Sequence, residues 1–330
     1  MNISTFLRCG AAMALMAAVW ITPAHTQAQT SGDLPKIVTL VVPQAPGGSN
    51  DAMGRAIAAR LPKIFNSSFI VDNRQGANGN VGLAWVAKTA PKDGSVWLVT
   101  VNSTLTINSL IYSQPGFDTS VDFVPVAGIA VVPHVLLAKA NFPVNSLEEL
   151  LDYSRKDPGK YSYGSSGNGT FSHLLMEQMK QSQKVTIAHI PYRGVAPAMA
   201  DLIGGQVQYV ISTLPAAMPF IKSGQLKPLA VTSLTRSGVL PNVPVANDTV
   251  PGMVADLWVA MYAPRGTSPS TVEQMHTAVA KVLEMPDMQS FLAAQGAMPL
   301  KAGPVELGAM TAAEMGRWTP IVKTTGMKID

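Results

Sequence analysis

Short apolar runs rich in β-branched residues alternate along this sequence with segments that carry a helical pattern. In the first part of the chain we expect strands at 37–42, 69–72 and 96–101, with helices at 51–61 and 81–89. Continuous apolar strands separated by helices are typical of a parallel sheet that is covered on both faces. The alternation therefore predicts an α/β fold.

The same alternation starts again after residue 130. Ser146 is expected to cap a helix, because Glu149 completes a capping box three residues later. Three C-terminal helices are expected to start near Pro269, Pro286 and Pro304, since proline suits the first turn of a helix. The expected strands of this second part are 135–138, 161–164, 186–190, 207–212, 229–233 and 258–262.

Two such series indicate two doubly wound domains. We expect domain I to contain 29–125 and, after a hinge return, the C-terminal part of 236–330, with domain II inserted at 126–235. The chain would then cross between the domains twice, near 124–132 and within 228–257. Two crossings make a hinge, with a cleft between the domains.

The first 28 residues are expected to be a secretory signal peptide. Arg8 precedes an apolar run of thirteen residues, 9–21, and the small residues that a signal peptidase reads end at Ala28. A membrane anchor is the alternative, but thirteen residues are too few for a bilayer, which needs about 20. We therefore expect the mature protein in the periplasm.

Removal of the signal peptide would change both the charge and the chemistry of the chain. The full chain has a net charge of +4 and one cysteine, which lies at position 9. Loss of Arg8 and Cys9 leaves 23 basic against 20 acidic residues, a net charge of +3, and no thiol. These values exclude a disulfide scaffold and a thiol enzyme. Because the basic residues are scattered singly, they do not predict nucleic-acid binding.

Three strand-to-helix turns are rich in glycine and hydroxyl side chains. We call 43–51 the first loop, 164–173 the second loop and 102–104 the third loop. Glycines let the backbone approach a ligand, and the free N–H groups at a helix start attract an anion. Open α/β folds bind ligands at the carboxyl ends of their strands, where these turns lie. The pattern therefore predicts a carboxylate site.

The sequence also contains partial matches to enzyme motifs. Ser166 and His173 are a candidate nucleophile and base for a secreted serine esterase, but Asn168 stands where the nucleophile elbow G-x-S-x-G requires glycine. The glycines match neither a P-loop nor a dinucleotide fingerprint. No pair of the four mature histidines has i, i+4 spacing, and we expect His189 to be a satisfied core residue. We therefore expect no metal, no cofactor and no catalysis.

At this point the chain resembles the Bug family of extracytoplasmic solute receptors, which serve tripartite tricarboxylate transporters. The resemblance extends over nearly the whole mature chain, and its motifs occur in the family's order. The first loop with Arg55 resembles P-x-x-P-G-G-x-x-D-x-x-x-R, and 73–79 resembles N-R-x-G-A-x-G. Further matching segments are the P-x-D-G turn at 91–94, the Gly-Ser segment 163–170 with His173, 191–194 and 201–207.

The resemblance implies a type II periplasmic binding fold and a small carboxylate ligand held between the first and second loops. Position by position, it implies contacts from Ala45, Gly47, Gly48, Ser49, Ser103, Ser165, Ser166, Gly169 and Thr170, with His173 as a further candidate. Many relatives carry an Asp where this chain has Ser212. Because Ser212 cannot pair with an ammonium group, a plain acid is favoured over an amino acid. Arg193 is a candidate for a second carboxylate, with a surface ion pair as the alternative.

The resemblance also implies partners. We expect a small organic acid (a di- or tricarboxylate or an aromatic acid) and the membrane permease of a tripartite transporter, with the receptor itself monomeric. Two alternatives stay open at this point. One is the esterase just described, and the other is a sensor that presents its closed form to a signalling partner.

Overall fold

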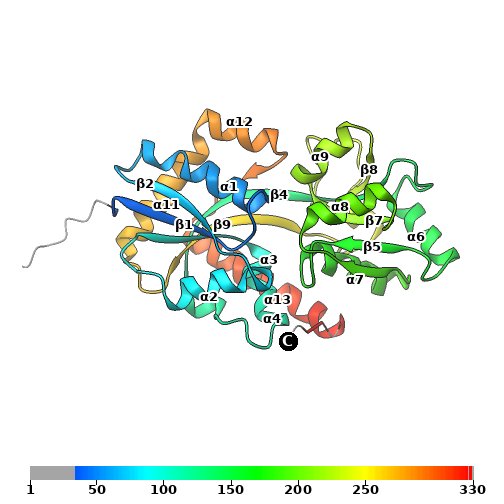
Figure 1. Ribbon diagram of the computed structural model, residues 1–330, viewed down its shortest axis with the longest axis horizontal. Helices are drawn as coiled ribbons and strands as arrows, with labels where there is room; N and C mark the ends of the chain where they lie inside the picture. Colours follow the sequence, from blue (N-terminus) through cyan, green and yellow to red (C-terminus); the bar gives the residue numbers. More distant parts are fainter. Residues whose placement is uncertain (1–33, 326, 329–330) are drawn as a thin grey trace, which may run out of the picture. The chain divides into compact units, whose positions relative to one another are not determined.

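Strand β1 (Ile37–Val42) lies at the centre of a parallel group, between β2 (Ser68–Asn73) and β3 (Val96–Val101). All six residues of β3 are buried, because helices cover both faces of the group. The structure is a computed structural model that describes residues 34–325 and 327–328 (Figure 1). The expected signal peptide, 1–28, lies outside the described residues.

The sheet continues with antiparallel neighbours. Strand β3 pairs antiparallel with β9 (Asp256–Pro264), and β9 pairs antiparallel with the first part of β4 (Phe123–Lys139). The parallel sheet expected for the first part of the chain is confirmed for β1, β2 and β3, while the antiparallel strands β9 and β4 make the sheet as a whole mixed. The reason is that β4 and β9 run in opposite directions beside each other, a relation that hydrophobic patterns along single strands do not encode.

Strand β4 has 17 residues and changes its partners along its length. Up to Pro133 it pairs with β9, and from His134 onward it pairs with β7 (Tyr209–Thr213) and β8 (Leu226–Val231). The sequence predicted only its second half, 135–138, as a strand. The strand accommodates its prolines at irregular positions, since the β4–β9 register shifts after Pro125 and Pro133 occupies the last position that pairs with β9.

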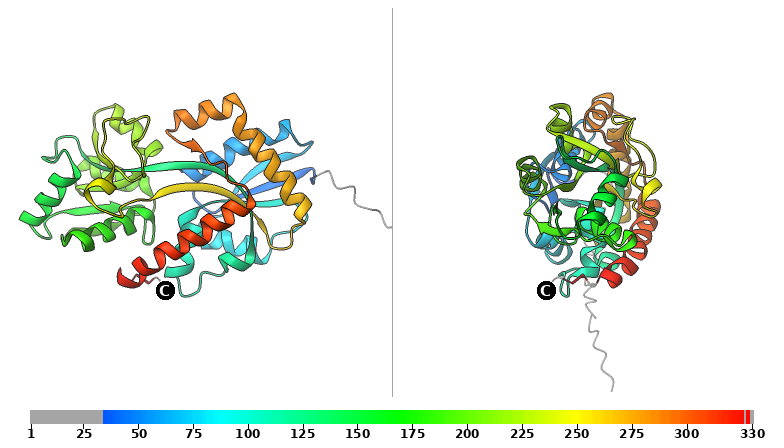
Figure 2. Two further views of the ribbon diagram at one scale, coloured as in Figure 1. Left: turned by 180° about the vertical axis from the view of Figure 1, so that it is seen from behind. Right: turned by 90° about the vertical axis from the view of Figure 1, so that its right-hand side faces the viewer.

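The elements divide into two groups at this point of β4, and Figure 2 shows the long strands that connect them. We call β1–β3, the first part of β4, β9 and their helices the first lobe, and the second part of β4 with β5–β8 the second lobe. In the second lobe β5 (Ser162–Ser165) pairs parallel with β6 (Ala188–Pro191) and with β7. The proposed boundaries at residues 125 and 235 stay predictions.

The helices follow the expected strand-to-helix order. Those of the first lobe are α1 (Ser49–Ala58), α2 (Asn80–Lys88), α3 (Asn102–Thr106), α4 (Asn108–Ile111), α5 (Thr119–Asp122), α11 (Pro269–Glu284), α12 (Pro286–Ala294) and α13 (Pro304–Thr325). Those of the second lobe are α6 (Leu147–Lys156), α7 (Phe171–Gln183), α8 (Val195–Gly204), α9 (Leu214–Lys222) and α10 (Ala246–Thr249). Two short 3₁₀ turns, η1 (Leu61–Lys63) and η2 (Ala77–Gly79), and the two-residue strand β10 (Met298–Pro299) complete the described elements.

The expected helix starts at Pro269, Pro286 and Pro304 are confirmed. The predicted cap is also present, because the Ser146 hydroxyl accepts from the Glu149 amide at 3.1 Å. Among the described residues, no helix combines the length and the apolar character that a bilayer crossing requires.

Candidate functional site

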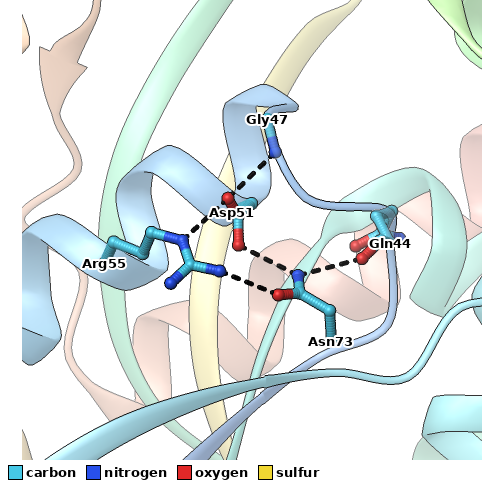
Figure 3. Close-up of polar contacts among 5 residues, drawn as sticks. All are labelled: Gln44, Gly47, Asp51, Arg55 and Asn73. Carbon is cyan, nitrogen blue, oxygen red and sulfur yellow. Dashed lines mark hydrogen bonds and ion pairs between the residues drawn. The ribbon is translucent and has the colours of Figure 1, made fainter.

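The first loop is held in place by a ring of polar contacts around Asp51 (Figure 3). Its carboxylate accepts from the Gly47 amide at 3.0 Å, from Arg55 Nε at 2.9 Å and from Asn73 Nδ2 at 2.9 Å. Asn73 Nδ2 also donates to the Gln44 carbonyl at 3.1 Å, while Arg55 donates to Asn73 Oδ1 at 2.9 Å. Both ends of the turn, Gln44 and Gly47, are thus fixed to one cluster.

Asp51 is 4% exposed, so its charge needs compensation. Burial by itself raises the pKa of the carboxyl group, but hydrogen bonds from Arg55, Gly47 and Asn73 outweigh it and hold the pKa below the usual range. The carboxylate is therefore charged at neutral pH. Asp51 and Arg55 of the first motif therefore have a structural role: they bind each other and fix the shape of the first loop.

Close packing accounts for Gly79, at the end of the 73–79 motif, and for Gly82, which follows it in α2. A Cβ on Gly79 would lie 2.6 Å from Thr104 Cγ2, and one on Gly82 would lie 2.8 Å from Pro43 Cβ. Gly79 also has φ +96°, which side chains other than glycine adopt rarely. These glycines let α2 and the turn before it pack directly against the first loop.

The second loop follows β5 and is crosslinked by its own hydroxyls. Ser165 is fully buried, and its Oγ lies 2.7 Å from His189 Nε2. Ser166 contacts Ser172 through both its amide (3.0 Å) and its hydroxyl (3.1 Å), and Thr170 Oγ1 donates to the Gly167 carbonyl at 2.7 Å. The loop thus has a defined shape without any ligand contact.

Two histidine side chains form hydrogen bonds with residues of the second loop. The His173 and His189 rings stack 3.9 Å apart, and Tyr163 stacks on the other side of His189 at 4.8 Å. His173 Nδ1 accepts from the Gly169 amide at 3.1 Å, so that amide is occupied within the protein. Burial lowers the pKa of both histidines to about 4, so both rings are neutral at pH 7.

His189 is a residue whose place the sequence reasoning missed. It was expected to be a satisfied core histidine, yet it is half-buried and bonds the hydroxyl at the end of β5. The β5–β6 register sets it beside Tyr163. That pairing arises from the alignment of two strands that are separated in the sequence, so no local pattern predicts it.

The first and second lobes touch where their loops end. Ser49 Oγ, at the start of α1, lies 3.1 Å from Thr213 Oγ1, at the end of β7. Strand β5 runs parallel to β7, with Gly164 paired to Val210, so the second loop leaves the sheet at the same end of the strands as Thr213. Ser212 precedes it and is 1% exposed. The start of α1, which follows β1, and the carboxyl end of β7 therefore lie close together, while the expectation that the first and second loops share one ligand site stays a prediction.

The remaining predicted residues lie around this region with different exposure. Ala45, Gly47 and Gly48 are exposed in the first loop, whereas Ser103 is 7% exposed in α3. Arg193 is exposed in the turn after β6. That turn adjoins the second loop, because the Tyr192 amide donates to the Ser165 carbonyl at 3.0 Å.

Helices α1 and α7 both start at this region without a side-chain cap. Ser146 caps α6 and Ser268 caps α11, whereas α2, α8, α9 and α12 also start without a side-chain cap. The first N–H groups of a helix have no partner within the helix, so an uncapped start leaves donors for another group. Gly48 and Thr170 precede α1 and α7 as their N-cap residues. This arrangement suits an anion, which helix N-termini stabilise.

Other surface features lie away from this region. A pocket of about 340 Å³ lies between Leu34, the segment 64–67 and helix α11, and shares no residue with the three loops. Within the described part of the chain, no group of three or more His, Cys, Asp or Glu side chains is placed to hold a metal ion.

The chain is similar to a known receptor family and to several solved structures. The family model described as tripartite tricarboxylate transporter family receptor matches residues 53–327. Three solved structures superpose on the chain. Rpa4515 of R. palustris with adipate is 37% identical with a TM-score of 0.83, and covers 88% of this chain and 98% of its own. MatC of Rhodopseudomonas palustris with bound malate is 30% identical with a TM-score of 0.79, covering 87% and 98%.

The third structure is that of the periplasmic binding protein BugD. It is 31% identical, has a TM-score of 0.80, and covers 88% of this chain and 98% of its own. These similarities confirm the expected fold class, an α/β fold of the periplasmic binding protein type with two domains. The expected resemblance to the Bug family is confirmed as well.

Proposed function

The chain belongs to the tripartite tricarboxylate transporter receptor family, and from this premise we propose that it is a periplasmic receptor for a small organic carboxylate. The observation that carries the proposal is the Ser49–Thr213 contact, which joins the two lobes where α1 starts and where the second loop leaves the sheet. A carboxylate placed there would accept from the uncapped N-termini of α1 and α7.

The energetics of such a site are adequate for a receptor. Each hydrogen bond to a charged group contributes about 1.5–3 kcal/mol. Each helix N-terminus adds about 0.3–2 kcal/mol, depending on burial. A few such contacts reach the roughly −8 kcal/mol of a micromolar dissociation constant after desolvation is offset. The backbone N–H groups involved, unlike Lys or Arg side chains, require no side-chain ordering.

Neutral groups at the end of β7 favour a plain acid as the ligand. Ser212 and Thr213 offer hydroxyls and no carboxylate that would pair with a ligand ammonium group. Two similar proteins hold the dicarboxylates adipate and malate in their structures. We therefore propose a mono- or dicarboxylic acid without an amino group. Closure of the lobes around it would present a surface to the permease of a tripartite transporter.

The geometry disfavours the esterase alternative. Ser166 Oγ contacts Ser172, and His173 Nδ1 is occupied by the Gly169 amide, so the candidate nucleophile and base have no contact with each other. Ser165 does contact His189, but Ser165 is fully buried and a substrate could not reach it. BugD, one of the similar proteins named above, is a periplasmic binding protein.

Calorimetric titration tests the proposal. The panel contains adipate, malate, citrate, benzoate and aspartate. We expect at least one plain acid to bind with a micromolar dissociation constant and aspartate to bind at least tenfold more weakly. Thr213→Val is expected to weaken binding about tenfold, since it removes the hydroxyl that meets Ser49.

Thr186→Val is the matched control, because Thr186 is exposed just before β6, at the opposite end of the second lobe's strands. It should leave the dissociation constant unchanged. Binding of none of the five acids at millimolar concentration would overturn the proposal. Tight binding of aspartate alone would overturn the assignment to plain acids.

A further inference from the structure

Helix α13 is anchored to the first lobe through its first half. Leu307 is fully buried, and Thr311 Oγ1 lies 2.8 Å from the Tyr262 hydroxyl of β9. A Cβ on Gly308 would lie 3.6 Å from Pro125 Cγ in β4, so the helix also lies close to that strand. The start of α13 is therefore fixed to the two strands that connect the lobes.

The second half of α13 extends to the second lobe, where Figure 1 shows it beside α7. Trp318 is fully buried, and its ring centre lies 5.4 Å from that of Phe171. Its indole N–H donates to Glu314 Oε1 at 2.6 Å, which fixes the ring orientation. Phe171 is the first residue of α7 and follows Thr170 directly. A first-lobe helix thus contacts a residue of the second loop.

The same cluster reaches the place where β4 changes partners. The His134 ring packs edge-on against Phe171 with ring centres 5.8 Å apart, and His134 is the first residue of β4 to pair with β7. Arg317 donates to the Val254 carbonyl, just before β9. Phe171 is therefore held between the crossing strand and α13. A motion of the second lobe relative to the first must therefore either break the contact between Phe171 and Trp318 or move Trp318 together with Phe171.

We infer that α13 acts as a brace between the lobes and that Trp318 is a positioning residue for the second loop. The inference goes beyond the proposed function, since it assigns a role to residues that lie outside the three loops. It rests on that function only in the interpretation of the second loop as a ligand loop. Loss of the indole should loosen the start of α7 and with it the loop contacts, such as that from the Gly169 amide to His173.

Hydrogen exchange of the ligand-free full-length protein tests the inference. The reporters are the amides of 165–176, among them Gly169, which donates to His173, and Leu174, which donates to the Thr170 carbonyl. In Trp318→Phe we expect these amides to exchange at least fivefold faster than in the wild type. The amides of β1 and β3, in the first lobe, should exchange at the same rate as in the wild type after correction for global stability.

Trp97→Phe is the matched control. Trp97 is also fully buried, and its indole N–H also has one acceptor, the Gly94 carbonyl at 2.8 Å, but it lies in β3 of the first lobe. It should leave exchange at 165–176 unchanged. Phe171→Leu changes the other residue of the Trp318–Phe171 contact and should accelerate exchange at 165–176 as Trp318→Phe does.

Equal exchange at 165–176 in Trp318→Phe and Trp97→Phe, or no acceleration in Phe171→Leu, would overturn the inference. Because no ligand is present, the result does not depend on whether a carboxylate binds. Failure of the proposed function and failure of the brace are thus distinguishable.

Discussion

Gly47 and Gly79 both have positive φ, at +85° and +96°, yet they meet different surroundings. A Cβ on Gly47 would touch nothing within 4 Å, because the first loop is exposed there. A Cβ on Gly79 would meet Thr104, Gln44 and Pro43 at 2.6–3.3 Å. At Gly47 only the backbone conformation requires glycine, whereas at Gly79 the close approach of the first loop requires it as well.

This difference gives a prediction at the residue scale. Gly47→Ala should lower the free energy of unfolding by about 1 kcal/mol, the penalty of a left-handed conformation. Gly79→Ala should lower it by about 2–4 kcal/mol, because overpacking adds to the same penalty. Urea denaturation of both variants measures the difference. Equal losses would show that the first loop moves away from residue 79 without resistance.

At the scale of elements, the junction of β4 and β9 combines backbone pairing with a buried carboxyl oxygen that has no hydrogen-bond partner. Asp256 pairs with Pro133 at the end of the β4–β9 ladder, and its Oδ1 is buried without a hydrogen-bond partner. Burial, assisted by the nearby Glu314 carboxyl, raises the pKa of Asp256 to about 6, although Arg317 opposes the shift. The junction is thus less stable when this group is charged.

We expect Asp256→Asn to stabilise the protein at pH 7.5 by about 1–3 kcal/mol. A carboxyl group whose folded pKa lies above its unfolded value disfavours folding above the folded pKa. The advantage of Asn should therefore shrink as the pH falls through 6 toward 4. Thermal and urea unfolding at pH 7.5 and pH 4.5 measure it. A variant that is destabilised equally at both pH values would show that Asp256 makes a favourable contact as an anion.

At the scale of the whole molecule, three buried or half-buried histidines share one property. Burial lowers the pKa of His134, His173 and His189 to about 4 each, and two of them form the stack under the second loop. Between pH 6.5 and 4 the unfolded chain therefore binds protons that the folded chain does not. Stability linked to these groups is present above pH 6.5 and is lost as the pH falls toward 4.

We predict that His134, which is 5% exposed, lowers the free energy of unfolding by about 2–3 kcal/mol between pH 6.5 and 4.5, whereas relief of the Asp256 penalty acts in the opposite direction. His134→Gln should show a shallower dependence on pH in the same interval. Urea unfolding at half-unit steps of pH measures both slopes. Because the Asp256 contribution is common to both proteins, identical slopes for the wild type and His134→Gln would contradict the assignment.

The sequence by itself determined the local elements and the chemistry of the loops. Strands β1 and β3 and the three proline-initiated helices were predicted to within a few residues, because hydrophobic spacing and helix-start residues are local signals. The Gly-Ser loops and their helix starts were predicted on the same basis. The motif residues Asp51, Asn73 and Arg55 were recognised, but their mutual contacts were not.

Only the tertiary structure determined which segments of the chain pack against each other. The antiparallel passage of β4 and β9, the uninterrupted length of β4, the His173–His189 stack and the Trp318–Phe171 contact all join segments that are distant in the sequence. Such pairings depend on strand order and on the total packing of the chain. A stretch of sequence indicates which face of a segment is buried, but it does not indicate which other segment of the chain covers that face.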